Sequence, residues 1–297
     1  MELTITSPEN PMTASDAFWN QRHRIAAARE RLTALQRAVG RLTDLSASQW
    51  AQILAMTLEF RPDLVIELGR GLGNSTCVFT EAVNQSGANG RSIVSVCMGN
   101  DWDRLTRPRV AAIVPPEWFA PLQTHEARIE TFDFETPIAR ARRVLVFWDA
   151  HGFAVAEQVL ARIVPAIAHK PHLVIMHDLS DARYGPPESA RYQSRGLWTA
   201  NDWSGPRLRL GHIDTAVEQA IAAIDFTSRN RITLQSADHS FHTELGADPV
   251  KVDEMRRLLG PEWFSLNGHF FYFSLNERSG EFTFPALAAQ SAAAPAA

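Results

Sequence analysis

The chain has 297 residues, of which 45% are hydrophobic and 21% are charged, and its formal net charge is −4. This length is enough to bury a full hydrophobic core, and we expect one large α/β domain with additions. A slightly acidic chain offers no electrostatic footprint for a polyanion, so nucleic acid is not an expected partner. No run reaches the ~18 apolar residues of a membrane span, and the first residues lack the apolar stretch of a secretory signal. We therefore expect a cytoplasmic protein that does not bind membranes.

The first sixty residues predict helices. Apolar residues recur at helical spacing over 14–39 and again over 46–60, and Gly40 marks a stop between the two segments. Such helices cover a cofactor cleft, form a dimer surface or pack against the edge of a sheet, and the pattern does not distinguish these roles. We treat residues 1–60 as a helical extension of the main domain. The oligomeric state stays open, with a homo-oligomer among the expectations.

A strand, a glycine-rich loop and a helix follow within residues 62–82. The apolar run Asp63–Leu68 is too short for a core helix and lies between a proline and a glycine cluster, which predicts a buried strand. An amphipathic helix then begins near Asn74 or Ser75. The loop carries glycines at alternate positions: Gly69, Gly71 and Gly73. Because glycine allows positive φ and has no Cβ, a ligand can lie against the backbone at the start of the helix, which predicts a nucleotide-binding edge.

An acidic residue, Glu67, stands two positions before the first glycine. Dinucleotide sites usually show G-x-G-x-x-G, whereas the spacing here is G-x-G-x-G, and a carboxylate at the strand tip would repel a pyrophosphate. The carboxylate suits a ligand that carries a cationic amino group. The series Glu67-x-Gly69-x-Gly71-x-Gly73 resembles motif I of the class I S-adenosylmethionine (SAM) dependent methyltransferases. An ordinary glycine-rich turn of an α/β protein is the alternative.

The resemblance implies a Rossmann-like α/β fold, in which a seven-stranded and mostly parallel sheet binds SAM at the carboxyl ends of its strands. The residues that it assigns to SAM binding around the loop are Glu67, Gly69, Gly71, Gly73, Asn74 and Ser75. The family places an acid at the tip of the second strand to bind the ribose, but here Cys97 follows the predicted strand Ser92–Val96. Asp101 and Asp103 are the nearest carboxylates, and we take Asp101 as the candidate that bends back to the ribose.

A third strand is predicted over Arg128–Phe132, and Asp133 follows it. The resemblance implies that an acid at this place meets the adenine amino group, and Asp133 fits by position. A strand-end aspartate is also a common cap of a helix or a turn. Both interpretations of Asp133 stay open.

Polar side chains follow two further strands. The apolar runs Val144–Trp148 and Leu173–Met176 predict strands, and the amphipathic segment Phe153–Ala168 between them predicts a helix, which together make a β-α-β crossover. Adjacent parallel strands bring their carboxyl ends together at the ligand edge of the sheet. Four side chains able to bind a metal therefore converge there: Asp149, His151, His177 and Asp178.

Carboxylates with one or two imidazoles suit a divalent ion such as Mg²⁺ or Mn²⁺, for which the candidate ligands are Asp149, His177 and Asp178. Such an ion would hold the acceptor and lower the pKa of its hydroxyl, and His151 or His177 would take the proton. In a second interpretation a histidine and an aspartate act directly as general base. In a third, the aspartates cap the following segments and the histidines form local hydrogen bonds.

The pattern W-D-A-H-G, followed after about two dozen residues by I-M-H-D-L, narrows the resemblance. It is similar to the methyltransferase branch that holds sugar O-methyltransferases and cephalosporin hydroxylase-like proteins. The resemblance implies that Asp149 and Asp178 are metal ligands, and that His177 stands where another acid is expected. We expect an O-methyltransferase that acts on a hydroxyl of a small molecule or sugar-containing acceptor. The alternatives are a non-catalytic accessory protein of the same fold and a hydroxylase-like relative.

The remaining chain contains one long irregular segment, 180–212, which is rich in Gly, Pro and aromatic residues. We expect a lid over the acceptor there, with a dimerisation loop as the alternative. Helices and strands then alternate to the last predicted strand, His269–Leu275, which the resemblance implies is antiparallel. The main domain is predicted to span 61–285, and the alanine-rich tail 286–297 to be disordered.

Overall fold

The computed structural model describes residues 12–40, 45–177 and 215–285. The predicted lid at 180–212, the predicted ligand Asp178 and the tail 286–297 lie outside the described residues.

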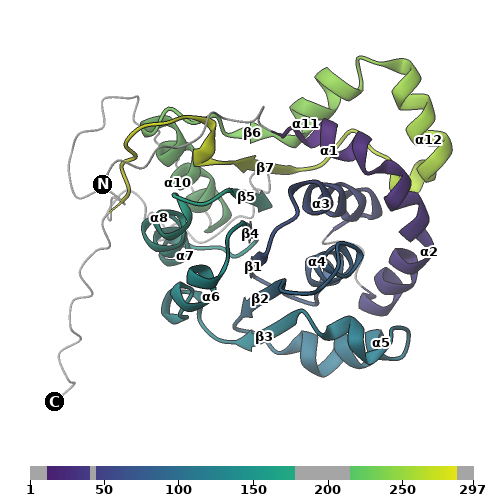
Figure 1. The fold of residues 1–297 in the computed structure, drawn as a ribbon, viewed down its shortest axis with the longest axis horizontal. Helices are drawn as coiled ribbons and strands as arrows, with labels where there is room; N and C mark the ends of the chain where they lie inside the picture. The colour runs from purple at the N-terminus through teal and green to yellow at the C-terminus, as the bar shows by residue number, and fades with distance from the viewer. Residues whose placement is uncertain (1–11, 41–44, 178–214, 286–297) are drawn as a thin grey trace.

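The described residues are built around a seven-stranded sheet with the order β3-β2-β1-β4-β5-β7-β6 (Figure 1). The strands are β1 Leu64–Leu68, β2 Ser92–Cys97, β3 Leu122–Glu126, β4 Val144–Trp148, β5 His172–His177, β6 Gln235–Ser236 and β7 Phe270–Phe273. Strands β1 to β5 are parallel, and β7 pairs antiparallel with both β5 and β6. The predicted Rossmann-like sheet, with its antiparallel last strand, is confirmed.

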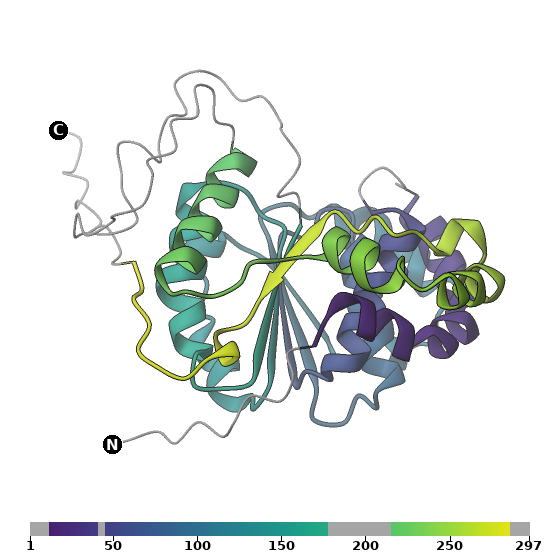
Figure 2. The ribbon, with the colours of Figure 1, turned by 90° about the horizontal axis from the view of Figure 1, so that it is seen from above.

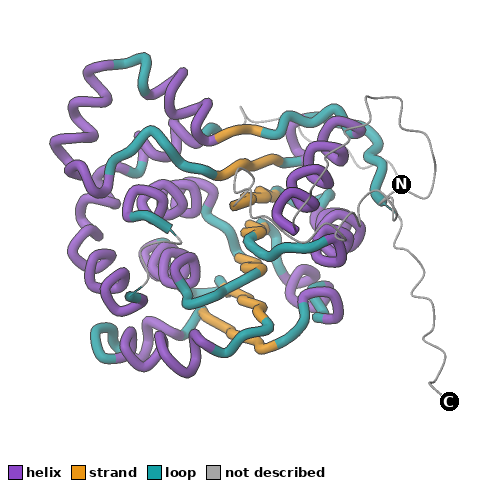
Figure 3. Tube along the Cα trace, turned by 180° about the vertical axis from the view of Figure 1, so that it is seen from behind, coloured by secondary structure: helices purple, strands orange, loops and turns teal. Residues whose placement is uncertain are grey.

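Helices cover both faces of the sheet (Figures 1 and 2). The helices on one side are α1 Ala14–Asn20, α2 Arg22–Val39, α3 Ala47–Phe60, α4 Asn74–Gln85, α5 Arg107–Ala111, α11 Ala237–Ser240 and α12 Pro249–Trp263. Those on the other side are α6 Glu135–Arg140, α7 Phe153–Gln158, α8 Val164–Ile167 and α10 Thr215–Arg229. Figure 3 shows the strands as a row between the two helical layers.

The two faces follow from the alternation of side chains along each strand. On β1, Val65 belongs to the core cluster shared with α3 and α4, whereas Leu64, Ile66 and Leu68 belong to the cluster under α7 and α8. The same alternation directs Glu67 toward α3 and α4. We call this side of the sheet the α3/α4 face.

The N-terminal helices pack on this face rather than on an edge of the sheet. Helix α3 buries 12 of its 14 residues, and its cluster includes both α1 and the β1 residue Val65. A capping box of Ser46 and Gln49 begins the helix. The predicted helix over 14–39 is divided at Gln21 into α1 and α2.

The prediction of the third strand was wrong. The strand β3 is Leu122–Glu126, and Ile129–Thr131 forms a 3₁₀ turn. Strand β3 lies at the edge of the sheet and is at most half-buried, so it has no apolar run in the sequence. Ile129 is instead buried as part of a turn under the opposite face. No helix of the described residues combines the length and the apolar character needed to cross a membrane.

His172 joins the start of β5 to the segment that follows β7. Its side chain is buried, its Nδ1 lies 2.8 Å from the carbonyl oxygen of Lys170, and its Nε2 accepts a hydrogen bond from the Leu275 backbone N–H at 2.9 Å. A ring held in this way is neutral, because Nε2 uses its lone pair. Burial lowers the pKa of His172 from 6.5 to about 4.

We expect the protein to lose stability as the pH falls through this interval. A histidine with a depressed folded-state pKa contributes stability above its unfolded pKa of 6.5, and this contribution is lost as the pH approaches 4. At 1.36 kcal/mol for each pKa unit, the shift corresponds to a loss of roughly 3 kcal/mol in the free energy of unfolding. Urea unfolding at neutral pH and at about pH 4.5 measures it, with His172→Asn as the non-titrating comparison. Equal losses in wild type and variant would contradict the prediction.

Candidate functional site

The glycine loop connects β1 to α4 at the carboxyl edge of the sheet. Gly69, Gly71 and Gly73 have φ of 91°, 51° and 93°, and the Gly73 N–H donates to the Arg70 carbonyl at 2.8 Å. Gly71 is exposed at the tip of the loop. The first N–H groups of α4 have no acceptor within the helix, so the loop ends at a helix terminus suited to a polar ligand.

Two of the three glycines are required by packing within the protein. A Cβ on Gly69 would lie 2.2 Å from the carbonyl oxygen of Asp149, and a Cβ on Gly73 would lie 2.1 Å from the ring of Trp102. Trp102 is fully buried against the start of α4. Gly71 is the one exposed glycine of the three.

Glu67 lies beneath this loop with no exposed surface. Its carboxylate accepts hydrogen bonds from Ser75 Oγ at 2.6 Å, from Thr76 Oγ1 at 2.8 Å and from Ser95 Oγ. Burial raises the pKa of Glu67, and these three hydroxyls act in the opposite direction. The carboxylate thus joins β1, β2 and the first turn of α4. Its expected contact with the amino group of a ligand stays a prediction.

The cofactor candidates Asn74 and Ser75 form the first turn of α4 and are buried. Ser75 is committed to Glu67 through its hydroxyl, as described above. The sequence analysis missed Thr76 and Ser95, which share that role. Both are hydroxyl residues that lie near the strand acid Glu67. Ser95 can be predicted as its partner only once β1 and β2 are known to be neighbours.

The acids after β2 are placed differently from each other. Asp101 pairs with Arg104 at 3.2 Å and is half exposed. Asp103 lies 4.0 Å from Nη2 of Arg70 in the glycine loop and accepts from Oγ1 of Thr124 in β3 at 3.4 Å. Of the two acids, Asp103 is therefore the one that contacts the glycine loop. The contact of Asp101 with a ribose stays a prediction.

Arg70 is a buried residue of the loop that sequence reasoning did not single out. Its Nη1 donates to the carbonyl and the hydroxyl of Ser95, at 2.9 and 3.0 Å. Nε and Nη2 have no hydrogen-bond partner among the described residues. The guanidinium holds the loop to β2 and faces Asp103.

Asp133 acts as a cap. It accepts from the backbone N–H of Glu135 at 2.9 Å and from the hydroxyl of Thr136 at 2.6 Å, at the start of α6. The hydrogen bonds from Thr136 lower the pKa of Asp133. Of the two interpretations left by the sequence, the structure shows the cap, and the adenine contact stays a prediction.

Asp149 and His177 meet at the ends of β4 and β5. His177 Nδ1 lies 3.2 Å from Asp149 Oδ1, and the side chains are 5% and 14% exposed for the histidine and the aspartate. The Phe147 ring stacks on the imidazole with centroids 6.4 Å apart. Asp149 is also tied to the glycine loop, because its N–H donates to the Leu68 carbonyl at 2.9 Å. We call Asp149 and His177 the dyad.

Two glutamines that the sequence analysis missed surround the dyad. Gln49 of α3 places its Nε2 3.4 Å from Nε2 of His177. Gln219 of α10 is fully buried and donates to the His177 carbonyl at 3.2 Å. Both residues approach from elements that are distant in sequence, so no local pattern indicates them.

Two predicted site residues remain, His151 and Asp178. His151 lies in the loop between β4 and α7 and is half-buried. Asp178 is outside the described residues. Within the described ranges, no group of three His, Cys, Asp or Glu side chains is arranged to hold a metal ion.

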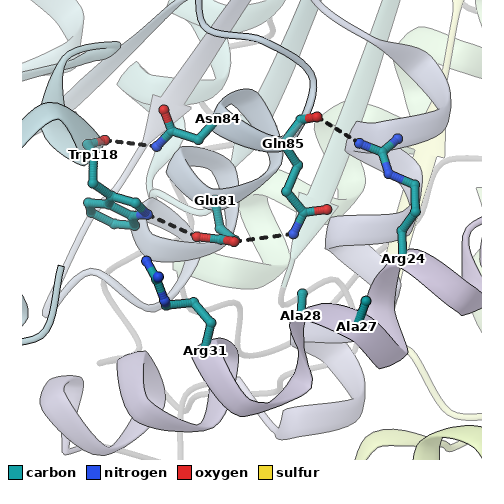
Figure 4. Close-up of a pocket in the computed structure, with 8 residues that line it drawn as sticks. All are labelled: Arg24, Ala27, Ala28, Arg31, Glu81, Asn84, Gln85 and Trp118. Atoms are coloured by element: carbon teal, nitrogen blue, oxygen red, sulfur yellow. Dashed lines mark hydrogen bonds between the residues drawn. The ribbon is translucent and has the colours of Figure 1, made fainter. Parts of the chain in front are cut away.

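A cavity of about 480 Å³ lies between α2 and the carboxyl end of α4 (Figure 4). Its lining residues are Arg24, Ala27, Ala28, Arg31, Glu81, Asn84, Gln85 and Trp118. Glu81 accepts from Trp118 Nε1 at 2.9 Å and from Gln85 Nε2 at 3.2 Å, and Arg24 donates to the Gln85 carbonyl at 3.0 Å. The cavity is at the opposite end of α4 from the glycine loop, and we assign it no part in the site.

No protein-family model matches the chain, and a comparison with curated proteins finds no match. Among solved structures, the chain is similar to the cofactor-bound Rv0187 protein from MTB, with 13% identity over 70% of this chain and 81% of that one, at a TM-score of 0.41. It is similar to an SAH-bound methyltransferase from Podospora anserina, with 13% identity over 78% and 93% of the two chains and a TM-score of 0.40. A third is a cyclopropane-fatty-acyl-phospholipid synthase-like protein from Lactobacillus casei, with 15% identity, 86% and 99% coverage and a TM-score of 0.37.

Identities and TM-scores this low say nothing about the chemistry of the site, which has to be inferred from the residues of this chain. The strand order and the antiparallel β7, established above, give the described residues the fold of the class I SAM-dependent methyltransferases.

Gly73→Ala should displace Trp102 from the start of α4, because the added Cβ overlaps the indole ring and φ is 93°. Gly90→Ala is the matched control: its φ is 74° and a Cβ there meets nothing within 4 Å. Both variants carry the backbone strain of a positive φ, roughly 1 kcal/mol, and only Gly73→Ala adds the clash. Tryptophan emission and melting temperature are the measurements. Equal melting temperatures for the two variants would contradict the contact.

Glu67→Gln should become more stable relative to wild type as the pH rises. An acid with a raised folded-state pKa contributes stability below its unfolded pKa, and this contribution is lost as the pH rises through the folded value. The amide does not titrate and still accepts from a hydroxyl, whereas Glu67→Ala leaves three hydroxyls without their acceptor, at about 1–3 kcal/mol for each buried group. Chemical unfolding of the three proteins across pH tests both statements. A stability difference between wild type and Glu67→Gln that does not change with pH would contradict the predicted pH dependence.

Proposed function

We propose that the protein is a SAM-dependent methyltransferase that transfers the methyl group to a hydroxyl of a small molecule or a sugar-containing acceptor. The observation that carries the proposal is the direct connection of the dyad to the glycine loop. Asp149 donates its N–H to Leu68, packs its carbonyl against Gly69 and places its carboxylate 3.2 Å from His177. A ligand on the loop and an acceptor at the dyad would be neighbours at one edge of the sheet.

The loop fits the cofactor. Gly71 presents exposed backbone, α4 begins directly after the loop, and the buried carboxyl group of Glu67 lies beneath. Asp103 would meet the ribose hydroxyls, which its contact with Arg70 of the loop supports, and Cys97 at the end of β2 is half-buried. When bound, SAM supplies a methyl group on a sulfonium. The residues of this chain then have to orient the acceptor hydroxyl and take up its proton.

Within the dyad, the geometry favours Asp149 as the group that meets the acceptor. Both nitrogens of His177 have protein partners, Asp149 at Nδ1 and Gln49 at Nε2, and its side chain is less exposed than that of Asp149. Asp149 would take up the proton of the acceptor hydroxyl, and His177 would orient the carboxylate. General bases of this kind contribute roughly 10²–10⁴ in rate.

Of the predicted metal ligands, Asp178 lies outside the described residues, and His177 does not fit the role. A histidine binds a metal through an unprotonated nitrogen with a free lone pair, and both nitrogens of His177 are engaged with Asp149 and Gln49. This donor arrangement favours the interpretation in which histidine and aspartate act directly as base. A requirement for Mg²⁺ or another divalent ion would need a different arrangement of these side chains.

Two variants test the proposal in separate steps. Gly71→Val should abolish SAM binding measured by calorimetry, because a branched side chain would cover the exposed backbone of the loop. Gly90→Val, which also has a positive φ and open space around it, should bind SAM like wild type. Asp149→Asn should bind SAM and lose roughly 10²–10⁴ of the methyl-transfer rate.

The product mass separates the chemical alternatives. Methyl transfer adds one CH₂ unit to the acceptor, whereas a hydroxylase-like relative would add one oxygen atom. No SAM binding in wild type would point to an accessory protein of the same fold instead. SAM binding that survives in Gly71→Val would count against the glycine loop as the cofactor site.

A further inference from the structure

A chain of hydrogen bonds leads from the N-terminal helices into the dyad. Gln49 stands in the first turn of α3 and is buried. Its Nε2 lies 2.9 Å from the Gly268 carbonyl oxygen and 3.4 Å from Nε2 of His177, whose Nδ1 in turn contacts Asp149. The helical extension therefore contributes a side chain to the site that the sheet alone would not have.

The orientation of the Gln49 amide is fixed by its two other partners. Its Oε1 accepts from the Ser46 backbone N–H at 2.8 Å, which is half of the capping box that begins α3. Its Nε2 donates to the Gly268 carbonyl, which can only accept. A flipped amide would place two donors together at Ser46 and two acceptors together at Gly268. The group that faces His177 is therefore an N–H donor.

Gly268 is itself held in place, so its carbonyl oxygen is a fixed acceptor for the Gln49 amide. Its N–H donates to Asp238, which also accepts from the N–H of His269 at 3.1 Å. A Cβ on Gly268 would lie 2.9 Å from the ring of Phe270, so the segment is tightly packed before β7.

We propose that Gln49 is a positioning residue of the dyad, whose amide N–H keeps Nε2 of His177 unprotonated and so directs the hydrogen on Nδ1 to Asp149. A neutral imidazole has one donor and one acceptor nitrogen, and a donor at Nε2 selects the tautomer with its hydrogen on Nδ1. In the other tautomer, the lone pair of Nδ1 would face the carboxylate and repel it. The catalytic part of this inference rests on the proposed function, whereas the choice of tautomer does not.

The inference is tested by long-range ¹H–¹⁵N correlation NMR on full-length protein with ¹⁵N-labelled histidine. Wild-type His177 should show a proton on Nδ1 and none on Nε2. Gln49→Glu keeps an acceptor for the Ser46 N–H and hence the cap, but it offers Nε2 only acceptor oxygens. A proton should therefore appear on Nε2 in Gln49→Glu, and Gln49→Met should no longer show a single tautomer.

Gln52→Met is the matched control. Gln52 is a buried glutamine one turn further along α3, and it donates to the Ser265 carbonyl at 2.8 Å without contacting His177. It should leave the His177 signals as in wild type. With an acceptor in hand, Gln49→Met should lower kcat roughly tenfold to a hundredfold, part of what a general base contributes, without changing SAM affinity. Gln52→Met should keep the wild-type kcat.

The choice of the His177 tautomer and its effect on catalysis can be contradicted separately. A proton on Nε2 in wild type, or an unchanged His177 in Gln49→Glu, would overturn the role of Gln49. A wild-type kcat in Gln49→Met would overturn the catalytic part of that role. The expected NMR pattern together with no methyl transfer to any acceptor would leave the tautomer selection standing and reject the proposed function.

Discussion

The buried carboxyl group of Glu67 is the constraint on which the shape of the glycine loop and its connection to α4 depend. A carboxylate removed from water is costly unless hydrogen bonds replace its hydration, and here hydroxyls of Ser75, Thr76 and Ser95 do so. Ser75 and Thr76 belong to the first turn of α4, so that turn must lie close to the tip of β1. The chain then has only residues 69–73 in which to reverse direction. Positive φ at the glycines follows from this short connection.

The alternation of side chains along parallel strands sets the rest of the site. Glu67, Asp149 and His177 lie at the ends of three adjacent strands and share the α3/α4 face. The side chains that complete the site must therefore come from the helices on that face. This explains why α4 supplies the hydroxyls for Glu67 and why α3, from the N-terminal extension, supplies Gln49 to His177.

What the sequence could predict was local. The glycine loop, the strand Val144–Trp148 and the meeting of Asp149 with His177 follow from short apolar runs and from the rule that parallel strand ends are neighbours. The third strand failed because an edge strand needs no apolar run. Gln49 was missed because it reaches His177 across 128 positions of sequence. Such a contact depends on how α3 packs on the sheet.

The exposure of the three acids at this edge accounts for their different roles. A charge that contacts a ligand has to be reachable, whereas a charge that shapes the backbone can be buried if its hydrogen bonds are complete. Glu67 is fully buried, the Asp149 side chain is 14% exposed, and the Asp103 side chain is 40% exposed. In the proposed function, this order fits Glu67 to the loop, Asp149 to the reacting hydroxyl and Asp103 to the ribose. The acid nearest to the glycines in sequence is thus the least exposed of the three, because the fold itself occupies its oxygens.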